Sequence, residues 1–428
     1  MSSQGTQRNL LLELRWRGPF RHRNYRLFWF GQLISLAGTW VQSISQAWLV
    51  IDLGHDPFWL GAIAAAQFTP VLFLGLFGGV IADALPKRPA LIGTQAALML
   101  LAALQALLVA TGAINLPILF VLAACLGVVN AIDMPVRQSF FAELVPLAEV
   151  GRAVAFNSAM FNAARVVGPA IGGVLIGVVG VAACFALNAL SFLAVLLALL
   201  AIRDAELHSA PRGERLRSAA AVRVNLFEGL RYVARTPVIA LCVFTIGTVS
   251  GVAMNFNVII PELARSVLNV GAPGLGFLMA SVGLGSLCGA LFAAAQRRPR
   301  LVLVVLGGGI LGALSILAGI ASGSGAAWSV GATGVALFGA GFGAISMAAT
   351  ANASIQMAAP AALRGRVMSV YTTVFAGSTP VGALATGAVA SLIGAPGTLI
   401  LAGSLGVAAA LYAGLRWRAL FVQHASSR

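Results

Sequence analysis

The sequence predicts an all-α integral membrane protein with twelve transmembrane helices, and three features of its composition and pattern support this class. Hydrophobic residues make up 59% of the 428 residues and charged residues only 9%, whereas a soluble domain carries about 25% charged residues. The apolar residues form long stretches between short polar segments. Glycine, with 49 residues, is favoured where helices pack closely in lipid. This composition excludes a soluble enzyme, a disordered chain and a nucleic-acid-binding domain.

Each apolar stretch is long enough to cross a bilayer, which takes about 20 residues of helix. The predicted spans are 27–51, 58–82, 89–111, 116–139, 153–177, 180–202, 237–261, 274–296, 301–321, 327–350, 367–392 and 396–415. The longest polar stretch lies after the sixth span. It predicts three parts: an N-terminal six-helix bundle (1–202), a cytoplasmic central loop with an amphipathic helix (203–236) and a C-terminal six-helix bundle (237–428).

The basic residues predict the orientation of the chain in the membrane. Of the 27 Lys and Arg residues, 25 fall in the N-terminal tail, in alternate loops or at the C-terminus, and only Arg165 and Arg265 fall elsewhere. Cytoplasmic loops carry such an excess of positive charge. We therefore expect both termini in the cytoplasm. Residues 1–26 run directly into the first span, so we expect no cleaved signal peptide.

The two halves of the chain also repeat. A shift of 214 residues, half the chain length, places Gly168 on Gly382, Gly173 on Gly387 and Gly180 on Gly394. Such a parallel repeat predicts two bundles related by a pseudo-twofold axis along the membrane normal.

The loop between the second and third spans has a characteristic spacing. Its residues are Gly79, Asp83, Lys87 and Arg88. An ordinary short basic loop would also satisfy the charge rule, but this spacing resembles the signature loop of the major facilitator superfamily. Ala84 and Pro86 stand where the usual pattern has a basic residue and a glycine. The resemblance implies that the loop takes part in gating.

A second motif lies in the fifth span. It consists of Gly168, Pro169, Gly172 and Gly173. One interpretation is an inert packing kink, because proline removes a backbone hydrogen bond and glycine lets a neighbouring helix approach. The motif also resembles the antiporter motif of major facilitator exporters. The match is partial, since Ala155 and Ala164 occupy positions where glycine is expected.

Residues 20–415 as a whole are similar to the bacterial branch of this superfamily that includes the enterobactin exporter. Segments 38–42 and 130–138 carry much of the similarity. The resemblance implies a major facilitator fold in the bacterial inner membrane. It also implies proton-coupled efflux of a siderophore-like or drug-like small molecule by alternating access. We expect no cofactor, no metal, no nucleic-acid partner and a monomer embedded in the lipid bilayer.

Other functions compete with this interpretation. An importer or a lysophospholipid flippase could use the same fold, because a fold does not determine a substrate. A membrane-embedded enzyme would need paired carboxylates or an HExxH-type cluster in the spans, and the sequence has neither. The four cysteines lie singly in apolar runs and are expected to be buried hydrophobes.

Two charged residues inside predicted spans are candidates for the transport site, because a charge at the bilayer centre costs at least about 2.5–3.5 kcal/mol. Asp133 shares a helix face with Asn130 and is the candidate for proton coupling; a static ion pair with Arg137 and Lys87 is the alternative. Arg165 shares a face with Asn162. It either faces the central cavity, where it would favour an anionic substrate, or forms a structural pair with Asp133.

Further polar or aromatic residues in the spans could line the same cavity. The candidates are Trp40, Gln42, Asn255, Tyr371 and Thr379. Each could equally form a hydrogen bond between helices.

Overall fold

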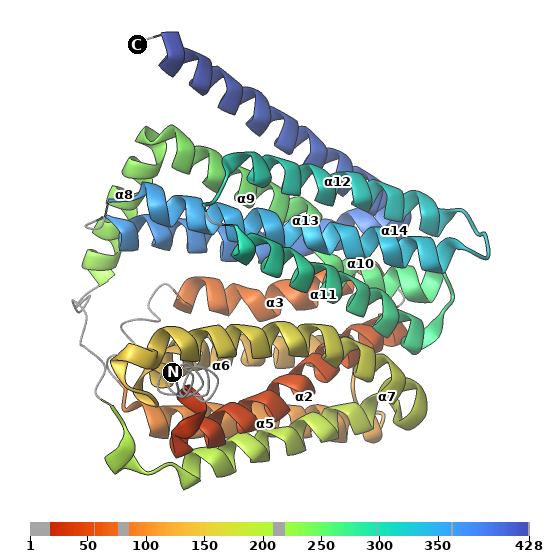
Figure 1. The fold of residues 1–428 in the computed structure, drawn as a ribbon. Helices are drawn as coiled ribbons and strands as arrows, with labels where there is room; N and C mark the ends of the chain where they lie inside the picture. The colour runs from red at the N-terminus through yellow and green to blue at the C-terminus, as the bar shows by residue number, and fades with distance from the viewer. Residues whose placement is uncertain are drawn as a thin grey trace, which may run out of the picture.

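The computed structural model describes residues 18–54, 56–75, 85–208, 219–296, 298–360 and 363–426, which are almost entirely helical and contain no strand. Figure 1 shows the helices running roughly side by side, with the first half of the chain (red to yellow) below the second half (green to blue). Helix suits such an apolar chain because it satisfies each backbone hydrogen bond within one segment.

The first half begins with two long helices joined by a short turn. At this turn the Asp56 carboxylate accepts a hydrogen bond from the Phe58 backbone N–H at 2.9 Å, and Asn115 caps a later helix through the Ile118 N–H at 2.9 Å. Both are ordinary N-terminal caps. The elements are η1 (Pro19–Arg21), α2 (Arg23–Gly54), α3 (Pro57–Gly75), α5 (Lys87–Ala110), α6 (Leu116–Glu143), η2 (Leu147–Glu149), α7 (Val150–Ala201) and η3 (Asp204–Glu206).

Helix α8 leads into the second half of the chain. The elements are α8 (Ala219–Arg235), α9 (Pro237–Ala253), α10 (Phe256–Glu262), η4 (Leu263–Val267), α11 (Gly271–Ala295), α12 (Leu301–Gly323), α13 (Ser329–Ala358) and α14 (Arg364–Ser426). The predicted span 237–261 lies within the candidate span Pro237–Val267, but its helix is interrupted between α9 and α10. Asn255 leaves the helical conformation there, and its side chain donates to the Gly251 carbonyl at 2.8 Å. Such local bonds compete with the helix.

Two helices contain a reversal of the chain. α7 and α14 have 52 and 63 residues, and each has one non-helical glycine: Gly180 with φ 79° and Gly394 with φ 74°. These positive φ values suit glycine, which has no Cβ to clash. The two glycines lie one repeat apart, so both halves break at the equivalent place.

Nine segments of the described residues are long and apolar enough to cross a membrane. The two that contain α7 and α14 each hold two predicted spans, so the nine segments overlap eleven of the twelve predicted spans. α2 does not meet this measure, since Gln32, Gln42 and Gln46 interrupt it. Its crossing, and therefore the full count of twelve, stays a prediction.

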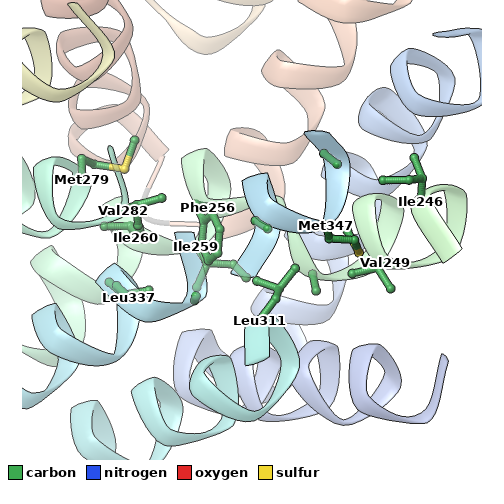
Figure 2. Packing of buried hydrophobic residues seen from close by; sticks show 14 of the residues in the cluster. Ile246, Val249, Phe256, Ile259, Ile260, Met279, Val282, Leu311, Leu337 and Met347 are labelled. Carbon is green, nitrogen blue, oxygen red and sulfur yellow. The ribbon is translucent and has the colours of Figure 1, made fainter. Parts of the chain in front are cut away.

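The packing divides the helices into two groups. α2 packs on α7, and α5 packs on α6 and α7; in the second half, α12 packs on α13 and α14, and α11 packs on α13. Figure 2 shows the interior of the second half, where Ile246, Phe256, Leu311 and Met347 meet in an apolar cluster. The two groups meet where α7 packs on α11 and where α3 packs on α14. We call these two crossings the seam.

Candidate functional site

Asp133 lies in a buried polar cluster inside the first half. Its side chain is fully buried, and its Oδ1 accepts hydrogen bonds from Thr94 Oγ1 at 2.7 Å and from Gln95 Nε2 at 2.8 Å, both on α5. Oδ2 has no hydrogen bond among the described residues and lies 3.4 Å from Nε of Arg137. One carboxylate oxygen is therefore held by neutral donors, while the other faces only a cation.

The cluster extends to α2 through Arg137. Its Nη1 donates to Oε1 of Gln32 at 3.1 Å. Lys87 does not take part, because its Nζ pairs with Glu143 at 2.5 Å. Asn130, the candidate next to Asp133, donates to the Leu126 carbonyl on its own helix at 2.9 Å. Asp133 therefore has the predicted ion pair with Arg137 and lacks the one with Lys87.

Arg165 lies midway between Val150 and Gly180 on α7 and is partly buried. It forms no hydrogen bond or ion pair with any residue that the structure describes. The structural pair with Asp133 is thus not formed, since that carboxylate is occupied by Thr94, Gln95 and Arg137. Asn162, one turn before Arg165, donates to the Ser158 carbonyl at 2.8 Å.

The glycine motif of α7 fixes this helix between two neighbours. Gly168 and Gly172 face α2, where added Cβ atoms would meet Trp40 and Val41. Gly173 faces α11 instead: a Cβ there would lie 2.5 Å from the Ala272 carbonyl oxygen and 2.7 Å from Cα of Gly276. The carbonyl of Pro169 also faces Gly276. The motif therefore forms half of the seam rather than an isolated kink.

The second half supplies a matching contact. Gly387, the repeat partner of Gly173, lies against Gly61 of α3, and a Cβ on Gly387 would be 3.0 Å from Cα of Gly61. Both contacts pack backbone against backbone at van der Waals distance, as small residues allow in membrane helices. The two halves thus meet through two equivalent glycine pairs.

An ion pair closes one end of the seam. Nη1 of Arg265 lies 2.8 Å from Oδ1 of Asp52, and the Arg265 guanidinium lies over the Trp48 ring, 4.9 Å from its centroid. Arg265 belongs to η4 in the second half, and its two partners belong to α2. The sequence analysis missed this pair, although Arg265 was one of two basic residues outside the charge pattern.

The opposite end, on the left in Figure 1 where α8 lies, holds the helix ends and connections whose sequence contains most of the described Lys and Arg residues, and we call it the basic end. Arg88 donates to the Leu199 and Leu200 carbonyls at 2.8 and 3.1 Å and pairs with Asp204 at 2.7 Å. It thereby caps the C-terminus of α7, where a cation is favoured. Among the described residues, the ion pairs at this end stay within the first half or join Arg366 of α14 to Glu228 of α8. Gly79 and Asp83 of the signature loop lie outside the described residues.

The remaining candidates make local or interhelical bonds. Gln42 is buried between α2, α5 and α7, where it donates to Gln105 at 2.8 Å and accepts from Asn188. Tyr371 donates to the Ala348 carbonyl at 3.3 Å, and Thr379 donates to the Phe375 carbonyl at 3.4 Å. Asn255 packs against Gly382.

Comparison with known proteins identifies the chain. The model of the transmembrane secretion effector family, a branch of the major facilitator superfamily, matches residues 16–426. The chain belongs to this family. It is therefore a major facilitator transporter, as the signature loop and the glycine motif predicted.

Curated relatives of this transporter include efflux pumps. The chain is 26% identical over 392 residues to the multidrug efflux pump Tap of Mycolicibacterium fortuitum, covering 87% of this chain and 91% of that protein. The Tap pump of Mycobacterium tuberculosis is 28% identical over 390 residues, covering 87% and 88%. A shorter match, 29% over 154 residues, covers 36% of this chain and 39% of the staphyloferrin A transporter of Staphylococcus aureus.

Solved structures share the fold. A bacterial homologue of the human lysosomal transporter Spinster, in an inward-facing and unoccupied conformation, superposes with a TM-score of 0.72 at 13% identity, covering 94% of this chain and 97% of that one. The D-xylose–proton symporter gives a TM-score of 0.67 at 16% identity, covering 90% and 97%. At these identities the likeness concerns the fold alone.

Proposed function

We propose that this transporter exports a small molecule in exchange for protons, by alternating access to a site at the seam. The observation that carries the proposal is the unequal closure of the seam. Glycine pairs and the Asp52–Arg265 ion pair join the halves at one end, whereas the described ion pairs of the basic end leave the two halves unlinked. A transporter closed at one end and released at the other presents its site to one side of the membrane.

The basic end is the cytoplasmic end in this proposal. The loops there hold nearly all Lys and Arg residues, as cytoplasmic loops do, so both termini lie in the cytoplasm of a bacterial inner membrane. Residues 1–202 and 237–428 are the two moving bundles, and 203–236 is the cytoplasmic connection between them. The transporter works as a monomer and leaves its substrate chemically unchanged.

Asp133 carries the coupling proton. Protonation would remove the charge that Arg137 faces, and it would leave the hydrogen bonds from Thr94 and Gln95 in place. Arg137 would then keep only Gln32 as a partner. Because Arg137 reaches Gln32 of α2 from α6, loss of its ion pair within α6 would free the guanidinium to shift at this contact and favour reorientation of the first bundle.

The export of dyes of different charge tests this function directly. Bacterial cells expressing the transporter are loaded with fluorescein, Nile red or ethidium, and efflux is followed after energisation with glucose. We expect faster efflux of at least one dye than in cells without the transporter, and loss of the difference when a protonophore is added. The Arg152→Gln variant, changed at an exposed position of α7, serves as an expression control.

Two outcomes would overturn the proposal. Energised uptake of a dye would identify an importer, and movement of a labelled lysophospholipid in the absence of dye efflux would identify a flippase. The efflux pumps among the relatives favour export.

A further inference from the structure

The charge balance around Arg165 is incomplete. Among the described residues, the acidic side chains of the first half that lie in or next to predicted spans already form ion pairs with other arginines. Asp133 pairs with Arg137, and Asp52 pairs with Arg265. In the second half, Glu228 pairs with Arg366, and Glu262 lies at the end of α10, three residues before Arg265. Arg165 is therefore partly buried and has no counter-ion among the described residues.

The position of Arg165 makes this lack of a partner informative. It lies about 22 Å along α7 from Val150, at 1.5 Å per residue, and its own carbonyl packs on Gly283 of α11 across the seam. A charge at this depth persists only where it meets water or an opposite charge. The guanidinium is a planar fork that suits carboxylate and phosphate oxygens.

Phe161 places an aromatic ring one helical turn before Arg165. Phe161, one turn earlier on α7, is 48% exposed, and its ring meets Trp40 edge to face at 6.0 Å. The repeat places Phe375 at the position of Phe161, and this ring is stacked on Tyr371 at 6.2 Å. Each half thus carries an aromatic pair one turn from equivalent seam positions.

Only one of these equivalent positions is charged. Thr379 stands where Arg165 stands in the first half, and its hydroxyl donates to its own helix. Of these two equivalent positions, the one in the first half therefore carries a cation and the one in the second half a neutral hydroxyl.

We infer that Arg165 binds the anionic group of an aromatic organic acid, whose rings pack on Phe161 and its neighbours. This inference rests on the proposed function and names the substrate class of the same site. Two hydrogen bonds from the guanidinium fork recognise the carboxylate, and the rings supply apolar contact. The carboxylate of the substrate supplies the negative charge that Arg165 lacks among the described residues.

Binding to the purified transporter tests the inference without measuring transport. Calorimetric titrations compare each acid with its neutral amide in three pairs: benzoate and benzamide, 1-naphthoate and 1-naphthamide, 9-anthracenecarboxylate and 9-anthracenecarboxamide. We expect at least one acid to bind about tenfold to a hundredfold more tightly than its amide, the range of a charged hydrogen bond. The Arg165→Gln variant should remove this preference, and Arg165→Lys should retain part of it.

The Arg152→Gln variant is the matched control, since it removes an arginine from the exposed start of the same helix. It should bind the acids as the wild type does. Each variant is first checked for a single monodisperse peak and an unchanged melting temperature. If Arg165→Gln does not fold, the Arg165→Lys titration decides: unchanged preference for the acid would contradict recognition by the guanidinium fork.

Equal affinities of acid and amide in all three pairs, including no binding of either, would overturn the inference. The dye experiment keeps the two proposals apart. Efflux of a dye together with equal acid and amide binding leaves the export function intact and removes the anion site. Acid binding that depends on Arg165, without efflux of any dye, supports the site and contradicts the export function.

Discussion

Asp133 in the first half and Met347 in the second lie 214 residues apart, at equivalent places in the repeat, yet one is a carboxylate and the other a thioether. Their partners follow the same shift. Thr94 donates a hydrogen bond to Asp133, whereas its equivalent Gly308 faces Met347, with a Cβ there only 3.3 Å from the sulfur. The same contact between helices is polar in one half and apolar in the other.

The difference extends through both interiors. By the same shift Gln32, Gln42 and Gln46 correspond to Ile246, Phe256 and Ile260, which Figure 2 shows in the apolar cluster of the second half. Buried hydroxyls of the second half often bond to their own helix, as Ser315 does to the Leu311 carbonyl at 2.8 Å. The interior of the first half is therefore more polar than that of the second half at these equivalent positions.

The largest expected effect tests the seam, where the two halves are alike. Gly173→Leu and Gly387→Leu should each reduce transport by about a hundredfold. The reason is that a large side chain in a tightly packed helix contact costs about 3 kcal/mol. Transport of a dye exported by the wild type measures this. Equal losses in both variants support equivalent roles of the two glycine pairs.

Gly151 provides the control for these variants. A Cβ at Gly151 would meet nothing within 4 Å, so Gly151→Leu should transport normally. Normal transport by either seam variant would contradict the account of the seam.

The next effect concerns the polar interior of the first half. Asp133→Asn should fold and bind substrate but lose proton-driven accumulation. For each coupled charge, 100 mV supplies about 2.3 kcal/mol, or roughly fiftyfold in concentration ratio. Accumulation in energised inside-out vesicles measures the loss. Met347→Leu, at the equivalent place, should change little; if Asp133→Asn accumulated substrate like the wild type, another group would carry the proton.

A smaller effect compares buried polar groups for stability. Gln105→Leu removes the donor and the acceptor that serve Gln46 and Gln42, and it should destabilise the first half by about 1 kcal/mol. Ser315→Ala should lower the free energy of unfolding by only a few tenths of that amount, because the hydrogen bond that it removes lies within one helix. Unfolding in mixed micelles with increasing SDS measures both. A larger loss of stability for Ser315→Ala than for Gln105→Leu would contradict this expectation.

The smallest effect concerns the ion pair at the closed end. Asp52 and Arg265 side chains are 35% and 40% exposed, and exposed pairs contribute about 0.2–1 kcal/mol. Asp52→Asn should therefore shift the population of the closed state by no more than about fivefold. Distances between spin labels on α2 and α11 report this shift, which should shrink in 0.5 M salt. An effect that salt leaves unchanged would point to packing on Trp48 rather than to charge.

Much of the fold follows from composition and pattern. Apolar stretches near 20 residues locate most helices, and the predicted span boundaries at 177–180 and 392–396 lie close to the backbone breaks at Gly180 and Gly394. The interruption at Asn255 could not be predicted, because a single asparagine within an apolar run is compatible with a continuous helix. α2 is too polar to count among the candidate spans, so its crossing stays a prediction.

The site was only partly predictable for a physical reason. Sequence places Asp133 and Arg165 at membrane depth, but the partner of a buried charge depends on how helices rotate against each other. In this structure the rotation brings Asp133 within hydrogen-bond distance of Thr94 and Gln95. No sequence pattern marked these two residues as its partners. The Asp52–Arg265 pair joins residues more than two hundred positions apart, and the anomalous position of Arg265 was its sole signal.

The unequal closure of the seam is tested most directly by locking its closed end. Asp52→Cys and Arg265→Cys are combined in a variant whose native cysteines are replaced, and a short bis-maleimide joins the two thiols across the gap that the ion pair spans. We predict that the cross-link forms readily and that transport of an exported dye then stops, while each single-cysteine variant treated in the same way stays active. Full transport by the cross-linked protein would contradict alternating access through this end.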